Sequence, residues 1–369
     1  MNQKDNHSQL LKLVWPISFQ YLMTSLVSAS DAFMLGFLDQ TSLSAVSLAA
    51  QVAFVFSLFY YAFVFGFNVL GAQYWGKKDE ASVKKVITIT LKYTLIVGIL
   101  FSLVTLTIPE TVMRIFTSDT ALITTGARYL RVVSASYFLT GISQIYFGVL
   151  KVCDRAGLSS LIGSLAVVVN IGLNALFIFG IGPIPEMGVV GAALATVCAR
   201  VFEVIFALIV VQKYKCPSTS IRALFGKGDA LLVKDYWKYS LPLLANQLGW
   251  GLGVTMYSVI MGHLGTDAAT GYLMGMLLMS TYYVVGGSLN STIIAGIFPA
   301  GGDTKFGMYC DTITLWCVVV PLGLIFAFWI EAPVLVVAFI LTLDEIVKIP
   351  AVYWHYMKYK WVKNITREM

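Results

Sequence analysis

The chain has 369 residues, of which 58% are hydrophobic and only 12% charged, and its mean hydropathy is +0.80. A water-soluble domain of this length carries about 25% charged residues to cover its surface. The net charge of +6 does not indicate nucleic-acid binding, because the basic residues stand in short connectors where the positive-inside rule accounts for them. Composition therefore excludes a soluble domain and indicates an integral membrane protein.

Apolar runs of about 20 residues recur along the chain, the length that crosses a hydrocarbon core about 30 Å thick. They are too long and too uniformly apolar for the alternating strands of a membrane barrel, so the spans are expected to be helices. The predicted spans are 13–37, 45–70, 88–108, 129–150, 160–181, 188–211, 239–264, 272–298, 309–329 and 333–354. The fold class is thus predicted to be an all-α polytopic membrane protein.

The basic residues predict the orientation of these spans. With the N-terminus on the cytoplasmic side, 21 of the 25 lysines and arginines fall in segments that would be inside. The exceptions are Arg114, Arg128, Arg131 and Arg200. We therefore expect both termini to be cytoplasmic.

The chain is predicted to form two lobes, 1–212 and 237–369, joined by a cytoplasmic linker at 213–236. A shift of 226 residues pairs Lys12 with Lys238 and Pro16 with Pro242, and Tyr129 pairs with Tyr272. From Pro16 to Tyr129 is 113 residues, but from Pro242 to Tyr272 is only 30. Between these markers the second lobe is therefore short by 83 residues, which corresponds to about two helices and their loops.

Three stretches resemble the multidrug and toxic compound extrusion (MATE) family. They are Ser30–Gly36 (SDAFMLG), Gly71–Gly76 (GAQYWG) and, most specifically, Asn170–Thr196 (NIGLNALFIFGIGPIPEMGVVGAALAT). The resemblance implies a two-lobed helical bundle on a twelve-helix plan, of which this chain would keep about ten helices, six plus four. It also implies export of cationic amphipathic compounds, driven through alternating access by a H⁺ or Na⁺ gradient.

In many prokaryotic members of the family that this chain resembles, the coupling cation is bound in the first lobe, on a first-helix aspartate and fifth-helix polar groups. Asp31, Asn170 and Asn174 match those positions, and Thr196 in the next helix is a candidate hydroxyl ligand. A carboxylate at membrane depth has to be paired, protonated or cation-bound, which suits Asp31 to this task. Asn170 and Asn174 are four residues apart and share one helical face. The alternative is that these polar groups only hold helices together.

Other residues have simpler interpretations. Tyr61, Tyr137, Gln144 and Tyr282 are candidates to line a substrate cavity, where aromatic rings hold flat cations. Arg200 and Glu203 are expected to pair locally, and Asp344 and Glu345 to pair with Lys348. Gly188, Gly191, Ala192, Ala195 and Ala199 form rows of small residues for close helix packing.

The sequence predicts no enzyme, cofactor or resident metal, apart from Na⁺ at Asp31, Asn170 and Asn174. Gly71–Lys77 has P-loop spacing, but Lys78 replaces the required Ser or Thr, so ATP is not expected. The predicted function is secondary active efflux of small organic cations by H⁺ or Na⁺ antiport, by a monomer in a prokaryotic plasma membrane. The alternatives are a truncated, transport-impaired remnant of such a protein and a lipid-linked precursor flippase.

Overall fold

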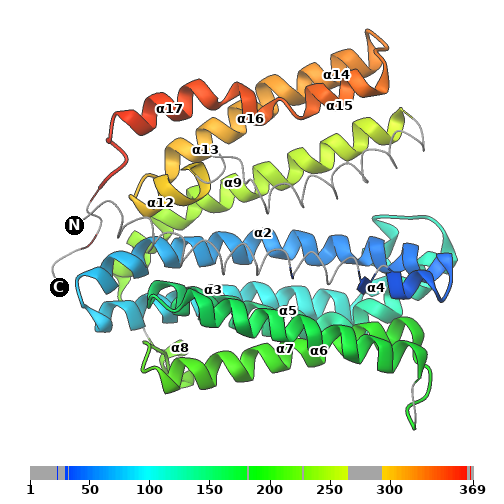
Figure 1. The fold of residues 1–369 in the computed structure, drawn as a ribbon, viewed down its shortest axis with the longest axis horizontal. Helices are drawn as coiled ribbons and strands as arrows, with labels where there is room; N and C mark the ends of the chain where they lie inside the picture. Colours follow the sequence, from blue (N-terminus) through cyan, green and yellow to red (C-terminus); the bar gives the residue numbers. More distant parts are fainter. Residues whose placement is uncertain are drawn as a thin grey trace. The chain divides into compact units, whose positions relative to one another are not determined.

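The computed structural model describes residues 23, 30–31, 33–180, 183–226, 228–264, 293–363 and 366. Within these ranges the regular structure is helical and contains no strand (Figure 1). Six helices there are long and apolar enough to cross a membrane. They are α2 (Gln40–Gly76), α3 (Glu80–Thr107), α5 (Thr120–Val152), α6 (Ala156–Phe179), α7 (Gly188–Lys213) and the continuous helix Thr304–Phe328. The prediction of an all-α polytopic membrane protein is confirmed.

The helix Thr304–Phe328 consists of the successive segments α13, η2 and α14, and shorter or more polar elements complete the described chain. They are α4 (Pro109–Arg114), α8 (Ile221–Leu224), α9 (Ala230–His263), η1 (Ile293–Ile297), α12 (Phe298–Ala300), α13 (Thr304–Ile313), η2 (Thr314–Val319), α14 (Val320–Phe328), α15 (Val334–Leu341), α16 (Asp344–Val347) and α17 (Ile349–Met357). The predicted spans 13–37 and 272–298 lie largely outside the described residues, as do Tyr272 and Tyr282.

The prediction of one continuous span over 333–354 is wrong, because this segment is divided into α15, α16 and α17. A turn at Thr342–Leu343 ends α15, and a second break falls at Lys348. Pro350 supplies one reason for the second break, since a proline has no amide hydrogen to donate to the preceding turn of a helix.

Internal contacts divide the chain into two units, Met1–Tyr60 with Asp79–Gly228, and Tyr61–Lys78 with Asp229–Met369. The second half of α2 belongs to the second unit, where the Tyr236 hydroxyl donates to the Phe63 carbonyl at 3.3 Å. Because α9 begins at Ala230, the segment predicted as a linker, 213–236, contains α8 and the first turns of α9.

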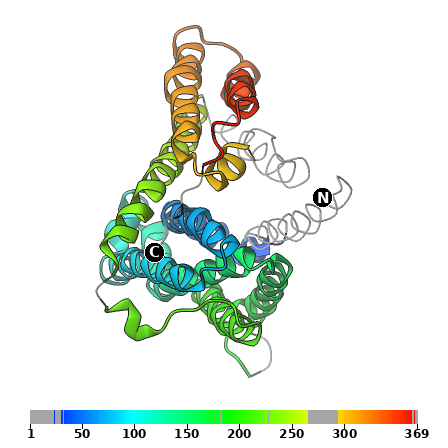
Figure 2. The ribbon, with the colours of Figure 1, turned by 90° about the vertical axis from the view of Figure 1, so that its left-hand side faces the viewer.

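In the first unit, α5 lies beside both α3 and α7, and α7 lies beside α6 (Figures 1 and 2). Helix α6 shows why the bundle forms. Its apolar side chains Leu161, Leu165 and Val168 are 44–59% exposed on one face, as suits contact with lipid. Asn170 and Asn174 are buried on the opposite side. The helix therefore directs its polar groups into the protein and its large apolar groups outward.

Glycines allow α6 and α7 to form a tight antiparallel pair. Gly180 ends α6 with φ +68°, a conformation that L side chains rarely adopt. Gly191 on α7 approaches the α6 backbone so closely that a Cβ atom there would lie 2.5 Å from the Phe177 oxygen. Ala192 and Ala195 are buried on the same helix, as expected for a packing row of small residues. This pairing fixes α6, and with it Asn170 and Asn174.

In the second unit, one apolar cluster joins α9 to the helices that follow η1. Its buried members include Tyr257, Ile260, Leu315, Val337 and Leu341. Helices α14 and α15 form an antiparallel pair at one end of this cluster (Figure 1). The unit thus has an apolar core of its own.

Candidate functional site

The Asp31 carboxylate lies against α6 inside the first unit. Asp31 stands in helical backbone ahead of α2, and the next turn packs Leu35 against Ile178 of α6 and Ala192 of α7. This apolar contact holds the helix so that Asp31 Oδ1 accepts a hydrogen bond of 2.5 Å from Asn174 Nδ2. Two of the residues predicted to bind the coupling cation are therefore in direct contact.

Asn170 and Asn174 extend the site along α6. They are four residues apart, and the Asn174 amide donates a second hydrogen bond to Asn170 Oδ1 at 3.3 Å. Asn170 is 4% exposed and Asn174 is fully buried. Both hydrogens of the Asn174 amide are thus directed at oxygen atoms of the site.

The carbonyl oxygen of the Asn174 side chain is different. It is buried, and it has no hydrogen-bond partner among the residues that the structure describes. A buried amide oxygen without a partner costs about 1–3 kcal/mol. A cation in contact with this oxygen would remove that cost, so the donor set fits a cation ligand.

Helices α5 and α7 contribute Tyr129 and Thr196, respectively, to the wall of the site. The Thr196 hydroxyl donates to the Ala192 carbonyl at 3.1 Å, so its lone pairs stay available as acceptors. The Tyr129 side chain is a hydrogen-bond partner of Thr196 and interacts electrostatically with Asp31 and Arg200. Sequence reasoning used Tyr129 only as a marker of the repeat and missed it as a member of the site. Its position near the start of a span gave no signal of function.

A buried ion pair lies on α7, one turn beyond Thr196. Arg200 Nη1 donates to both carboxylate oxygens of Glu203 at 2.7 Å, which confirms the predicted local pair. Ser143 on α5 adds a hydrogen bond of 3.0 Å to Glu203, whose side chain is 6% exposed. Arg200 also acts electrostatically on Asp31. With both acids ionised, Asp31, Arg200 and Glu203 carry a net charge of −1, which one monovalent cation neutralises.

The candidate substrate-lining residues lie in different environments. Tyr137 is 3% exposed and packs its ring 5.4 Å from that of Phe56. Gln144 is half-buried on the same helix, α5. Tyr61 is half-buried, stacks on Phe65 at 6.2 Å and belongs to the second unit. Tyr282 lies outside the described residues, and the shared role of these four residues stays a prediction.

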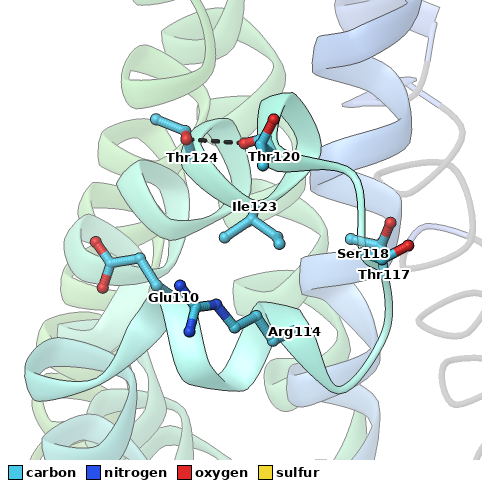
Figure 3. A pocket seen from close by; sticks show the side chains of 7 residues that line it. All are labelled: Glu110, Arg114, Thr117, Ser118, Thr120, Ile123 and Thr124. Atoms are coloured by element: carbon cyan, nitrogen blue, oxygen red, sulfur yellow. Dashed lines mark hydrogen bonds between the residues drawn. The ribbon is translucent and has the colours of Figure 1, made fainter.

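An open pocket of about 450 Å³ lies at one end of the first unit, between α4 and the start of α5 (Figure 3). Glu110, Arg114 and Thr120 line it, together with Thr117, Ser118, Ile123 and Thr124. Thr124 donates to the Thr120 carbonyl at 2.8 Å, as expected for a hydroxyl within a helix. None of the residues around Asp31 lines this pocket, and we assign it no function.

Comparison with known proteins shows what this chain is similar to. Residues 16–176 match the MatE family. The "Uncharacterized transporter YisQ" of Bacillus subtilis is 22% identical over 72% of this chain and 58% of its own length. The "Multidrug export protein MepA" of Staphylococcus aureus is 25% identical over 70% of this chain and 56% of its own length. The chain therefore spans about three fifths of the length of the curated relatives that it matches.

Solved structures share the fold. The crystal structure of a MATE protein in the bent conformation has a TM-score of 0.77, with 16% identity over 95% of this chain and 94% of its own. A MOP superfamily transporter from Pyrococcus furiosus has a TM-score of 0.77, with 17% identity over 95% of both chains. The match over residues 16–176, the curated relatives at 22–25% identity and the shared fold together make this chain similar to MATE proteins.

Proposed function

We propose that this protein exports small organic cations across a membrane by antiport, with H⁺ or Na⁺ moving inward through the site at Asp31. The observation that carries the proposal is the short hydrogen bond between Asp31 and the buried Asn174, beside an amide oxygen that lacks a partner. The names of relatives such as MepA, a multidrug export protein, support the substrate class.

Electrostatics explain why such a site binds a cation. A carboxylate inside the membrane costs several kcal/mol unless it is neutralised. The residual charge of −1 on Asp31, Arg200 and Glu203 makes binding of one H⁺ or one Na⁺ favourable. A proton would bind to the Asp31 carboxylate itself. Sodium would be held by the oxygens of Asp31, Asn174 and Asn170, with Thr196 as a further hydroxyl ligand, because hard cations prefer oxygen ligands.

Antiport then follows from linkage between the cation and the substrate. A cation that neutralises Asp31 weakens its charge-assisted bond to Asn174 and so favours a different packing of the first-span helix against α6. If one of the two packings binds the organic cation more tightly, each ligand lowers the affinity for the other by the same factor. Movement of the coupling cation down its gradient then drives the organic cation across the membrane in the opposite direction.

Efflux of a fluorescent organic cation tests this proposal. The chain would be produced in cells that lack their main drug pumps, and efflux would be measured after collapse of the proton gradient or the sodium gradient separately. We expect one of the two treatments to stop efflux. Efflux that is indifferent to both gradients would contradict the proposal.

A second candidate is a transport-impaired remnant of such an exporter. It rests on the repeat spacing within the sequence, where the segment from Pro242 to Tyr272 is 83 residues shorter than the matching segment from Pro16 to Tyr129. Restoring the missing helices from a full-length relative distinguishes the two candidates. If only the restored protein exports the dye, the remnant account holds.

A further inference from the structure

The second unit contains a buried ionic cluster that the site at Asp31 does not use. Lys348 Nζ lies 2.9 Å from Asp311 Oδ1 on α13 and 3.9 Å from Asp344 Oδ2 on α16. The lysine side chain is only 6% exposed, and the two aspartates are 17% and 18% exposed. The predicted pairing of Lys348 with Asp344 is confirmed, but Asp311 is the nearer partner. The Glu345 side chain lies outside the described part of the chain.

An amide from α9 completes the cluster. Asn246 Nδ2 donates to Asp311 Oδ2 at 3.2 Å, so the two oxygens of Asp311 each have a donor. The carbonyl oxygen of the Asn246 side chain is buried and has no hydrogen-bond partner among the described residues. This repeats the chemistry at Asn174, where a buried amide binds an acid through its nitrogen and keeps its oxygen unpartnered.

The backbone is irregular on both sides of the cluster. Lys348 stands at the break between α16 and α17, and η2, a π-helical segment, begins three residues after Asp311. Broken helices and π-helical turns within membrane spans recur at ion and substrate sites, because they free backbone and side-chain groups to face a ligand.

The charges and ligand types match a site for one small monovalent cation. The carboxylates of Asp311 and Asp344 face the ammonium of Lys348, which is a compact point charge on a flexible stem, and the Asn246 amide is bonded to Asp311. A buried ion pair is weak evidence of stabilisation, because apolar side chains of the same volume are often equally stable or better. The Lys348 ammonium therefore occupies a position between carboxylate oxygens that a free cation could take.

We propose that Asp311, Asp344 and Asn246 form a second monovalent-cation site, in which the ammonium of Lys348 is the resident cation. While the Lys348 ammonium occupies the site, it excludes free Na⁺. Occupancy of the site is then independent of the sodium gradient. Removal of the ammonium leaves the largely enclosed carboxylates of Asp311 and Asp344 without this cation, and the site then takes Na⁺ from solution. This inference does not depend on the proposed function of Asp31.

The thermal stability of the purified protein tests the proposal. Every variant carries Asp31→Asn, so that sodium binding at the first site does not contribute. The melting temperature is measured in NaCl and in choline chloride at equal ionic strength. We expect Na⁺ to raise the melting temperature of the Lys348→Met variant by about 2–4 °C. Replacing choline chloride by NaCl should not change the melting temperature of the parent, which retains Lys348. It should also not change that of the control Lys360→Met, which replaces an exposed lysine.

Two further variants keep the test decisive. Lys348→Gln removes the charge but retains a hydrogen-bond donor for Asp311, and it should show the same response to sodium if the methionine variant fails to fold. Adding Asp311→Asn to either variant removes a carboxylate and should abolish the response. A variant without Lys348 that is stable but whose melting temperature does not respond to Na⁺ would overturn the proposal. So would an equal response from the parent that retains Lys348.

Discussion

Asn174 Nδ2 donates to Asp31 Oδ1 at 2.5 Å and so joins the first-span helix to α6 inside the first unit. The same amide also donates to Asn170 Oδ1 at 3.3 Å. One side chain therefore orients both the acid and the second amide of the candidate cation site. Its own carbonyl oxygen is buried and has no partner among the described residues. In the proposed function, a change of charge on Asp31 would act on α6 through this hydrogen bond.

Replacement of Asn174 by alanine should reduce coupled efflux at least tenfold. The substitution removes a hydrogen bond to a charged group, which contributes about 1.5–3 kcal/mol, and it removes an oxygen ligand. Asn170→Ala is the matched control, because Asn170 accepts the longer bond of 3.3 Å from Asn174, and its replacement should reduce efflux less. Equal effects of the two substitutions on the initial rate of dye efflux would argue against the special role of Asn174.

Gly191→Ala should destabilise the first unit by about 1–3 kcal/mol. The new Cβ would lie 2.5 Å from the Phe177 oxygen and 2.6 Å from its carbonyl carbon, so α6 and α7 would have to separate. Since Asn174 lies on α6 one turn before Phe177, efflux should fall as well. Gly172→Ala on α6 is the control. A Cβ atom at Gly172 meets open space, so this substitution should be neutral or slightly stabilising. Melting temperatures of the two variants in detergent check the prediction. A Gly191→Ala variant with the melting temperature of the parent would refute the close contact.

Removal of the Glu203 charge alone should lower the free energy of unfolding strongly. Removal of both charges of the Arg200–Glu203 pair should lower it much less. In Glu203→Gln, Arg200 loses a carboxylate at 2.7 Å inside the bundle, and we expect a loss of about 3 kcal/mol of unfolding free energy. The double variant Glu203→Gln, Arg200→Met should recover most of that loss. Glu186→Gln, at an exposed position, controls for the change of side chain. Denaturation of the four proteins measures the coupling, and a double variant as unstable as the single one would contradict this interpretation.

The stability contributed by Asp303 should disappear in acid. Burial raises the pKa of this carboxyl, but the Lys363 charge and hydrogen bonds from Phe306, His355 and Lys363 outweigh that effect and hold its pKa below the usual value of 3.8. A carboxyl whose pKa is lower in the folded state stabilises the fold above its unfolded pKa and loses that contribution as the pH falls through the folded pKa.

The difference in melting temperature between the parent protein and Asp303→Asn measures this contribution. It should be constant from neutral pH down to about 4 and shrink below that value. Lys363→Met should reduce the difference, because Lys363 Nζ lies 3.3 Å from Asp303 Oδ2. A difference that grows on acidification would have the wrong sign for this account.

Much of the fold follows from hydropathy alone. Spans such as 188–211 end within a few residues of the helices that form there, because about 20 apolar residues can bury their backbone polar groups in lipid only as a helix. The break at Lys348 escaped prediction, since Pro350 near the end of an apolar run resembles a tolerated proline within a span.

The site was predictable only in part. Asp31, Asn170 and Asn174 stand out as polar residues inside apolar runs, and four-residue spacing places the two amides on one face. Tyr129 and the contact of Asn246 with Asp311 were missed, because each depends on how distant helices pack. Local pairs such as Arg200 with Glu203 were found, because both residues lie on one helix turn.

The central claim is that the Asp31 carboxylate couples an inward cation to outward substrate. Dye efflux by Asp31→Asn tests it most directly, measured in cells without their main pumps and at matched expression, for the chain as it stands and for the version with the second lobe restored. The account predicts that Asp31→Asn abolishes gradient-dependent efflux in every background where the parent transports, while Glu186→Gln retains it. Gradient-driven efflux that persists undiminished in Asp31→Asn would contradict the account.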